Sequence, residues 1–293
     1  MVQFLQQIIN GLSLGSIYAL VALGYTMVYG IIKLINFAHG DIYMLGAYIG
    51  FICIRFLHMS FIPALIVAMV LCAVIGVVIE KIAYRPLRNA TRIAALITAI
   101  GVSFFLQYST MQVMGSAIQT YPENTIIDGA ITFMGLRVTY QQIYIFVITI
   151  VLMCVLQYVV RKTKVGRAMR AVSADSDAAR LMGINVDNTI SITFAIGSAL
   201  AGAAGILVGV YYNSITPLMG SVPGLKAFIA AVFGGIGIIP GAMLGGFSIG
   251  VIETLVSGYG SSLYKDAVVY AILIVILLVK PAGLLGKNRK EKV

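Results

Sequence analysis

Long apolar runs are the feature of this sequence that most limits what it can fold into. Runs close to the ~20 residues that cross a bilayer as a helix lie at 5–29, 36–57, 61–79, 93–115, 141–160, 190–212 and 265–281. Hydrophobic residues make up 60% of the chain and charged residues only 10%, whereas a soluble domain carries about 25% charged residues. The core of a soluble domain could not bury this many apolar residues, so we expect an integral membrane protein that crosses the bilayer many times.

One further apolar stretch, 225–257, is glycine-rich and too long for a single simple span. The spans on either side of it run in opposite directions, so this stretch either crosses twice or dips in and out, and the sequence leaves both possibilities open. We predict an all-α polytopic transmembrane helical bundle with roughly eight or nine membrane-embedded segments, including broken or re-entrant helices. Residues 1–293 form one transmembrane domain, with a loop at 161–189.

Basic residues account for the net charge of +10, and they gather at the ends of spans in 81–92, 161–180 and 280–292. Such residues stay on the cytoplasmic side, where they favour lipid headgroups, so nucleic acid is not an expected partner. The segment 116–140 carries Glu123 and Asp128 against Arg137 alone and suits the opposite side. The amino terminus is therefore expected outside and the carboxyl terminus inside. The opening residues lack a basic n-region, so the first helix is expected to be retained.

Small residues recur every four positions in two of the spans. Gly197, Ala201 and Gly205 do so in the span after the loop, and Gly11 and Gly15 do so in the first span. Because lipid supplies no hydrophobic drive between helices, such stripes allow backbones to approach closely. We expect these stripes to serve tight packing inside the bundle, with a role in helix sliding as the alternative.

Polar residues open the second apolar run. Asn36, His39 and Asp41 stand together there, and Gly40 permits a backbone break from which Asp41 could cap a helix that extends to about residue 57. Ionisable groups at membrane depth mark solute pathways more often than chance would allow. These three are candidate pathway residues, with helix capping or structural hydrogen bonding as the alternative.

Glu253 is the clearest acid inside an apolar segment. It must face the bundle interior or water, and we expect it to pair with Lys226 or Lys265. No second acid shares its span, so a fixed pair is favoured over a proton relay. Glu253 is also a candidate pathway residue.

The run 233–246 is dense enough in glycine to interrupt a helix inside the membrane. Broken backbone is tolerated there only where it is buried in protein or lines a watery cavity. Pro240 suits the first turn of a new helix, because it lacks the N–H that would be left without a partner. The run is either a pathway lining or a structural hairpin, and its candidate pathway residues are Gly234, Gly235, Gly237 and Pro240.

The basic loop 161–189 is expected to fold into one short amphipathic helix. Val165, Met169 and Val172 fall at helical spacing, and Leu181 and Met182 continue the apolar set. Such a helix needs a surface on which to dock. Lipid headgroups are one choice, and a groove on a soluble protein partner, which suits small exposed alanines, is the other.

The end of this loop carries its own signals. Gly183 is placed to adopt the left-handed conformation that ends a helix, with Ile184 making the hydrophobic contact of a Schellman motif. Asp187 can cap the next span.

Several of these segments together resemble a known family. Residues 170–187 look like the coupling loop of ATP-binding-cassette importer permeases. With 36–41, 226–237, 240–246 and 281–286, they make the chain closely similar to the LivH-type permeases of the high-affinity branched-chain amino acid importers. The resemblance runs nearly the whole chain. Neighbouring members of that family carry urea or other amides, so the family is better defined than the solute.

The resemblance implies a multi-pass subunit of the bacterial inner membrane that pairs with a second, homologous permease. Two cytoplasmic ATPases would dock on the coupling loops, and a periplasmic binding protein would deliver leucine, isoleucine or valine. By similarity, the ATPase-coupling role falls on Gly166, Arg170, Ala171, Asp175, Ala178, Ala179, Gly183 and Ile184.

No catalytic role is expected for the chain itself. It lacks a GxxxxGK[ST] motif, so ATP would be bound by the partner subunits and the chain would need no cofactor. Its three cysteines form no CxxC, and no histidine cluster accompanies them, so no metal site is expected. The rival functions are a secondary transporter driven by protons or sodium, which would want paired acids at mid-membrane, and a membrane-embedded enzyme, which would want a catalytic constellation across spans.

Overall fold

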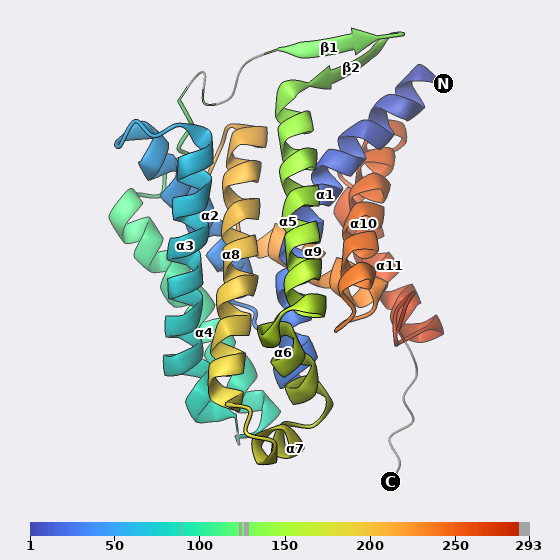
Figure 1. Ribbon diagram of the computed structural model, residues 1–293. Helices are drawn as coiled ribbons and strands as arrows, with labels where there is room; N and C mark the ends of the chain where they lie inside the picture. Colours follow the sequence, from blue (N-terminus) through green and yellow to red (C-terminus); the bar gives the residue numbers. More distant parts are fainter. Residues whose placement is uncertain (89, 123–124, 126–128, 287–293) are drawn as a thin grey trace.

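The computed structural model describes residues 1–88, 90–122, 125 and 129–286, and most of them are helical (Figure 1). The predicted acids Glu123 and Asp128 and the basic residues at 287–292 lie outside this part of the chain. The elements, in order, are α1 (Val2–Ile32), α2 (His39–Arg55), α3 (Phe61–Ile79), the π-helical turn η1 (Glu80–Tyr84), the 3₁₀ turn η2 (Arg85–Leu87), α4 (Arg92–Met114), β1 (Ala130–Phe133), β2 (Leu136–Thr139), α5 (Tyr140–Lys162), α6 (Lys164–Ala174), α7 (Ser176–Leu181), α8 (Val186–Tyr212), α9 (Ser221–Gly234), α10 (Ile239–Tyr259) and α11 (Lys265–Val279).

Six helices in the described residues are long and apolar enough to cross a membrane, namely α1, α3 with its two terminal turns, α4, α5, α8 and α10. The helices α2, α9 and α11 are shorter, with 17, 14 and 15 residues. The expected all-α, multi-pass bundle is therefore confirmed, and the predicted count of eight or nine embedded segments is approximate. The glycine-rich stretch consists of one short helix, α9, and one full-length helix, α10.

Small residues let the inner helices touch backbone to backbone. A Cβ built on Gly250 of α10 would overlap the backbone of Gly15 in α1, and one built on Gly46 of α2 would overlap the backbone of Gly202 in α8. A Cβ on Gly205 would strike the Tyr43 carbonyl oxygen. Both predicted stripes are thus used in helix contacts, and α1 and α8 lie buried at the centre of the bundle, as expected from close packing in lipid.

The outer helices turn large apolar side chains outward. Phe105 and Val113 of α4 are 70% and 80% exposed, and Ile66 of α3 and Val155 of α5 are more than half exposed. A soluble protein would bury such a surface, whereas hydrocarbon tails solvate it. The outer faces of α3, α4 and α5 therefore suit contact with lipid.

The two ends of the bundle differ. The amino terminus and the β1–β2 hairpin lie at one end, and α6 and α7 lie at the other (Figure 1). The hairpin pairs Ala130 with Thr139 and rests on α1, since the Gln6 side chain donates to the Arg137 carbonyl oxygen at 2.9 Å. The basic flank of 161–180 and the described part of 116–140, whose only basic residue is Arg137, are thereby placed at opposite ends.

Candidate functional site

The segment between α5 and α8 folds as two helices. Thr163 begins α6 by accepting a hydrogen bond from the Gly166 N–H at 3.1 Å, and Met169 and Val172 are buried against the bundle, as their spacing predicted. The prediction of a single helix was wrong, because Asp175 interrupts it. Its carboxylate accepts from the N–H groups of Asp177 and Ala178, both at 2.9 Å, and so starts α7 in a new direction.

The end of α7 has the predicted form. Gly183 has φ +80°, its N–H donates to Arg180, and the Ile184 N–H donates to Ala179, both at 3.0 Å, which is the Schellman pattern. The expected apolar continuation is wrong, however. Because α7 changes direction, Leu181 and Met182 face outward and are 89% and 82% exposed. Two large apolar side chains therefore stand free at the end of the bundle.

The predicted coupling residues differ in their burial and in what they contact. Gly166 and Arg170 hold α6 against the end of α5: a Cβ on Gly166 would strike the Val160 carbonyl oxygen, and the Arg170 guanidinium donates to that same oxygen. Ala179 is buried. In the same segment Ala171 and Ile184 are half-buried, and Asp175, Ala178 and Gly183 are exposed. The first three attach the segment to the bundle, and the exposed ones lie on its outer surface.

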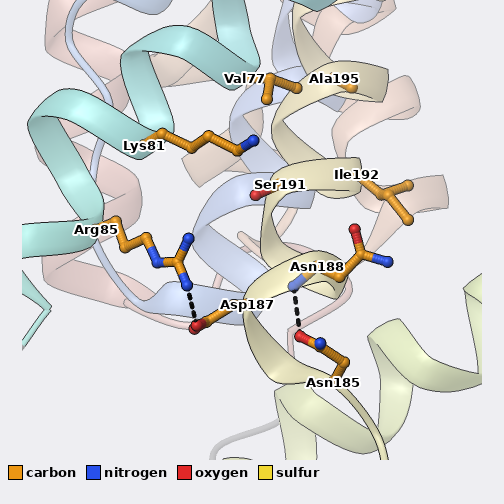
Figure 2. A pocket seen from close by; sticks show the side chains of 9 residues that line it. All are labelled: Val77, Lys81, Arg85, Asn185, Asp187, Asn188, Ser191, Ile192 and Ala195. Carbon is orange, nitrogen blue, oxygen red and sulfur yellow. Dashed lines mark hydrogen bonds and ion pairs between the residues drawn. The ribbon is translucent and has the colours of Figure 1, made fainter.

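The first turn of α8 follows directly. Asp187 was predicted to cap this helix, but the cap is Asn185, whose side-chain oxygen accepts from the Asn188 N–H at 2.9 Å. Asp187 lies two residues further on, within the first turn, and forms ion pairs with Arg85 and Arg88. Asn and Asp are both favourable capping residues. Because Asp187 is engaged by the two arginines, Asn185 caps the helix. Figure 2 shows the Arg85–Asp187 pair.

A buried acid extends this contact into an ionic clamp, by which we mean Glu80, Arg88, Asp187 and Ser191. Arg88 bridges Asp187 and Glu80, and Glu80 is fully buried. The Ser191 hydroxyl donates to the second Glu80 oxygen at 2.6 Å. The clamp joins the turns that follow α3 to the first turns of α8. Sequence reasoning missed it, although a lone acid at the end of an apolar run was a usable signal.

A pocket of about 380 Å³ opens beside the clamp. Lys81 and Arg85 project into it from the end of α3, and Figure 2 shows the Lys81 side chain extending across it toward Ser191 of α8. The first turns of α8 supply its other wall, including Asn188.

Arg88→Met is expected to destabilise the chain by about 3–5 kcal/mol, because it leaves the buried Glu80 carboxylate without its cation. Arg85→Met is the matched control. It removes an ion pair to the same Asp187, but both side chains are more than 40% exposed, so the cost should stay within about 0–1 kcal/mol. Thermal unfolding of the purified variants in one detergent measures the difference. Equal loss in both would show that the buried acid does not depend on Arg88.

Asn36, His39 and Asp41 are buried, but each meets a different helix. Asn36 accepts a hydrogen bond from Tyr84 at 2.8 Å, Asp41 accepts one from Gln107 at 2.8 Å, and His39 lies edge-on to Tyr25 with ring centroids 4.8 Å apart.

The predicted break at Gly40, with Asp41 as a cap, is wrong. The helix already begins at His39, after a turn in which the Asn36 carbonyl accepts from the His39 N–H at 3.1 Å. Asp41 consequently lies in the first turn and binds sideways rather than capping. These three polar residues therefore contact three different parts of the bundle.

The glycine-rich run forms the tight connection between α9 and α10. Pro240 lies in the first turn of α10, as predicted. A Cβ on Gly234 would overlap the Gly241 carbonyl oxygen, and Gly235 and Gly237 have φ of +109° and +89°. The connection also receives the chain after α11, because the Leu284 N–H donates to the Phe233 carbonyl at 2.8 Å. The glycines of this connection allow the backbones of its two sides to approach closely.

Glu253 lies at the centre of a charge cluster formed with Lys226, Lys265 and Asp266. Its Oε1 is 2.7 Å from the Lys226 ammonium and 3.7 Å from that of Lys265, so the two partners that the sequence left open are both present. Its Oε2 accepts a hydrogen bond from the Tyr18 hydroxyl at 2.8 Å. Lys226 also lies 2.6 Å from Asp266. The expected pairing of Glu253 with a lysine is therefore present, and a second acid, Asp266 of α11, extends it.

A cavity of about 290 Å³ borders the charge cluster, and we call it the inner cavity. It lies where α8 ends and α11 begins, at the opposite end of α8 from α6 and α7. Its lining joins the four charged residues to hydroxyls and aliphatic side chains: Leu14, Tyr18, Tyr43, Val208, Tyr212, Ser214, Thr216, Met219, Val222, Pro223, Lys226, Glu253, Lys265 and Asp266.

A bundle with apolar outer faces and a cavity lined by buried charges suits a membrane protein that passes a polar solute. Residues 7–277 match the family described as "Branched-chain amino acid transport system / permease component". The chain belongs to this family, and it is therefore a permease component rather than an enzyme.

Its relatives agree with this family over nearly the full length. The high-affinity branched-chain amino acid transport system permease protein LivH of Salmonella typhimurium is 46% identical, with 99% of this chain and 98% of the relative covered. The corresponding BraD of Pseudomonas aeruginosa has the same identity and coverage. Among solved structures, PsaBC from Streptococcus pneumoniae in complex with Fab matches with a TM-score of 0.50 and 12% identity, over 95% of this chain and 92% of that one. This last likeness concerns the fold alone.

Proposed function

We propose that the chain is a subunit of an ATP-driven importer and passes leucine, isoleucine and valine across the bacterial inner membrane. The observation that carries this proposal is the 46% identity over 99% of the chain to permeases named for high-affinity branched-chain amino acid transport. A related importer for urea, amides or other amino acids is the alternative. The aliphatic wall of the inner cavity favours branched-chain solutes over urea.

The proposed assembly has partners at both ends. A second homologous permease completes the membrane part. Two cytoplasmic ATPases dock on the coupling loops of the two permeases, which in this chain is the segment of α6 and α7. A periplasmic binding protein delivers the solute at the end that carries the β1–β2 hairpin. The basic flank at 161–170 supports a cytoplasmic location for α6 and α7 and a periplasmic amino terminus. Leu181 and Met182 are exposed apolar side chains of the kind that anchor protein interfaces. They support docking of a partner protein, whereas a self-sufficient secondary transporter would need no such partner.

The path from ATP to solute runs along α8. This helix has 27 residues, about 40 Å at 1.5 Å per residue, and it is continuous from Val186 to Tyr212. A displacement of α6 and α7 reaches α8 through the two-residue connection after Gly183, and the ionic clamp carries it to the end of α3. At the far end α8 contributes Val208 and Tyr212 to the inner cavity, so a tilt of α8 changes the shape of that cavity.

The proposal is tested by purifying the tagged chain from cells that express it with its neighbouring transport genes, and by reconstituting what is obtained. We expect an ATPase to co-purify, and we expect uptake of radiolabelled leucine to require ATP and the binding protein. A tenfold excess of unlabelled isoleucine should compete, and urea should not. Accumulation of leucine by the lone chain without ATP would contradict the proposal, and competition by urea would favour the alternative solute.

A further inference from the structure

The inner cavity combines buried and accessible charges. Lys226 and Glu253 form its floor and are almost completely buried, with Tyr18 completing the hydrogen bonding of Glu253. Lys265 and Asp266 form its rim, and their side chains are 38% and 44% exposed. The floor is therefore fixed, while the rim can exchange partners.

The four charges cancel. They form one series, Asp266 to Lys226 at 2.6 Å, Lys226 to Glu253 at 2.7 Å, and Glu253 to Lys265 at 3.7 Å. In surroundings of low dielectric constant, a solute with a net charge would leave one charge without compensation. A zwitterion adds one charge of each sign and keeps the balance. The series thus selects against simple anions and cations.

The remaining wall is aliphatic. Leu14, Val208, Met219 and Val222 line the inner cavity beside the charges. The volume of about 290 Å³ is many times the ~10–15 Å³ that one water molecule needs. A solute with a small charged head and a branched hydrocarbon tail therefore fits both parts of the lining.

We propose that the inner cavity is a transient binding site for the zwitterionic head of an aliphatic α-amino acid. The ammonium group binds Asp266, the carboxylate binds Lys265, and the side chain packs on the aliphatic wall. This inference rests on the proposed function and names the residues that contact the solute. Because the four charges already satisfy one another, the solute must displace existing pairs and is held weakly, which suits a conduit that must release what it binds.

Cysteine protection tests the site. Ser214 lines the inner cavity, so Ser214→Cys is introduced after Cys53, Cys72 and Cys154 are replaced by alanine. The assembled importer, without its binding protein, is placed in nanodiscs and labelled with an uncharged methanethiosulfonate reagent. The labelling rate is measured alone and with millimolar L-leucine, with isocaproate, which lacks the amino group, and with isopentylamine, which lacks the carboxylate. Ser262→Cys is the matched control, exposed between α10 and α11 and outside the cavity lining.

We expect L-leucine to slow the labelling of Ser214→Cys at least fivefold, and we expect the two single-charge analogues and the Ser262→Cys control to show no protection. Equal protection by all three compounds, or none by leucine, overturns the proposal. Val222→Phe provides a second measurement, because it fills the aliphatic wall without touching a charge. It should abolish the protection, and retained protection counts against the site. Loss of the site leaves ATP-dependent leucine uptake standing, whereas absence of that uptake would contradict the proposed function itself.

Discussion

Replacing both Leu181 and Met182 by aspartate is expected to weaken the binding of the ATPase to the permease strongly. The two side chains are 89% and 82% exposed at the end of α7, where a partner's groove would bury them. Apolar anchors at the centre of an interface are worth about 2 kcal/mol or more each, and every 1.4 kcal/mol is tenfold in affinity. Co-purification of the ATPase should fall at least tenfold, and ATP-dependent uptake should fall with it.

The matched control is Met134→Asp, an equally exposed methionine at the tip of the β1–β2 hairpin, at the opposite end of the bundle. It should leave ATPase co-purification unchanged. The double variant should still reach the membrane at the normal level, since neither side chain supports the fold. If the ATPase stays bound to it, the docking surface lies elsewhere. Bulky substitutions at Ala179 give a poorer test, because that residue is buried and its replacement disturbs internal packing.

Lys226→Met is expected to be the most damaging change within the membrane. It leaves the buried Glu253 carboxylate with only the Tyr18 hydroxyl and the more distant Lys265 ammonium. Breaking a buried ion pair by removing one partner costs about 3–5 kcal/mol. The midpoint of thermal unfolding in detergent should drop sharply, and the amount of chain in the membrane should fall.

A second substitution should repair the damage. In Lys226→Met with Glu253→Gln, the orphaned charge is removed, and the glutamine can still accept the hydrogen bond from Tyr18, so the thermal midpoint should recover most of its loss. Glu253→Gln alone is the control and should cost less than Lys226→Met, because Lys226 keeps Asp266 at 2.6 Å. If the double variant is no more stable than Lys226→Met, the two residues do not act as a pair.

Local signals were predicted well. The Schellman stop at Gly183, the start of α10 at Pro240 and the buried face of α6 depend on residues within a few positions of one another, so their spacing is visible in the sequence. The cap of α8 was not predicted correctly. Asp187 pairs with Arg88, which lies 99 positions away in the sequence, and Asn185 caps the helix instead. The break at Asp175 was missed for a different reason: its side chain competes with helix continuation, and propensity alone does not settle that competition.

The sequence by itself determined that the chain is a membrane protein, which spans lie at the centre of the bundle, and which loop is basic. Hydropathy, small-residue stripes and charge are each visible in short stretches of sequence, without knowledge of the tertiary structure. Only the tertiary structure decided which polar groups meet. Glu253 contacts Lys226, which is 27 positions away in the sequence, and Tyr18, which is 235 positions away. Glu80 contacts Ser191, which is 111 positions away. Those contacts depend on how each helix is rotated and crossed against its neighbours, and the periodicity of a single helix does not determine this.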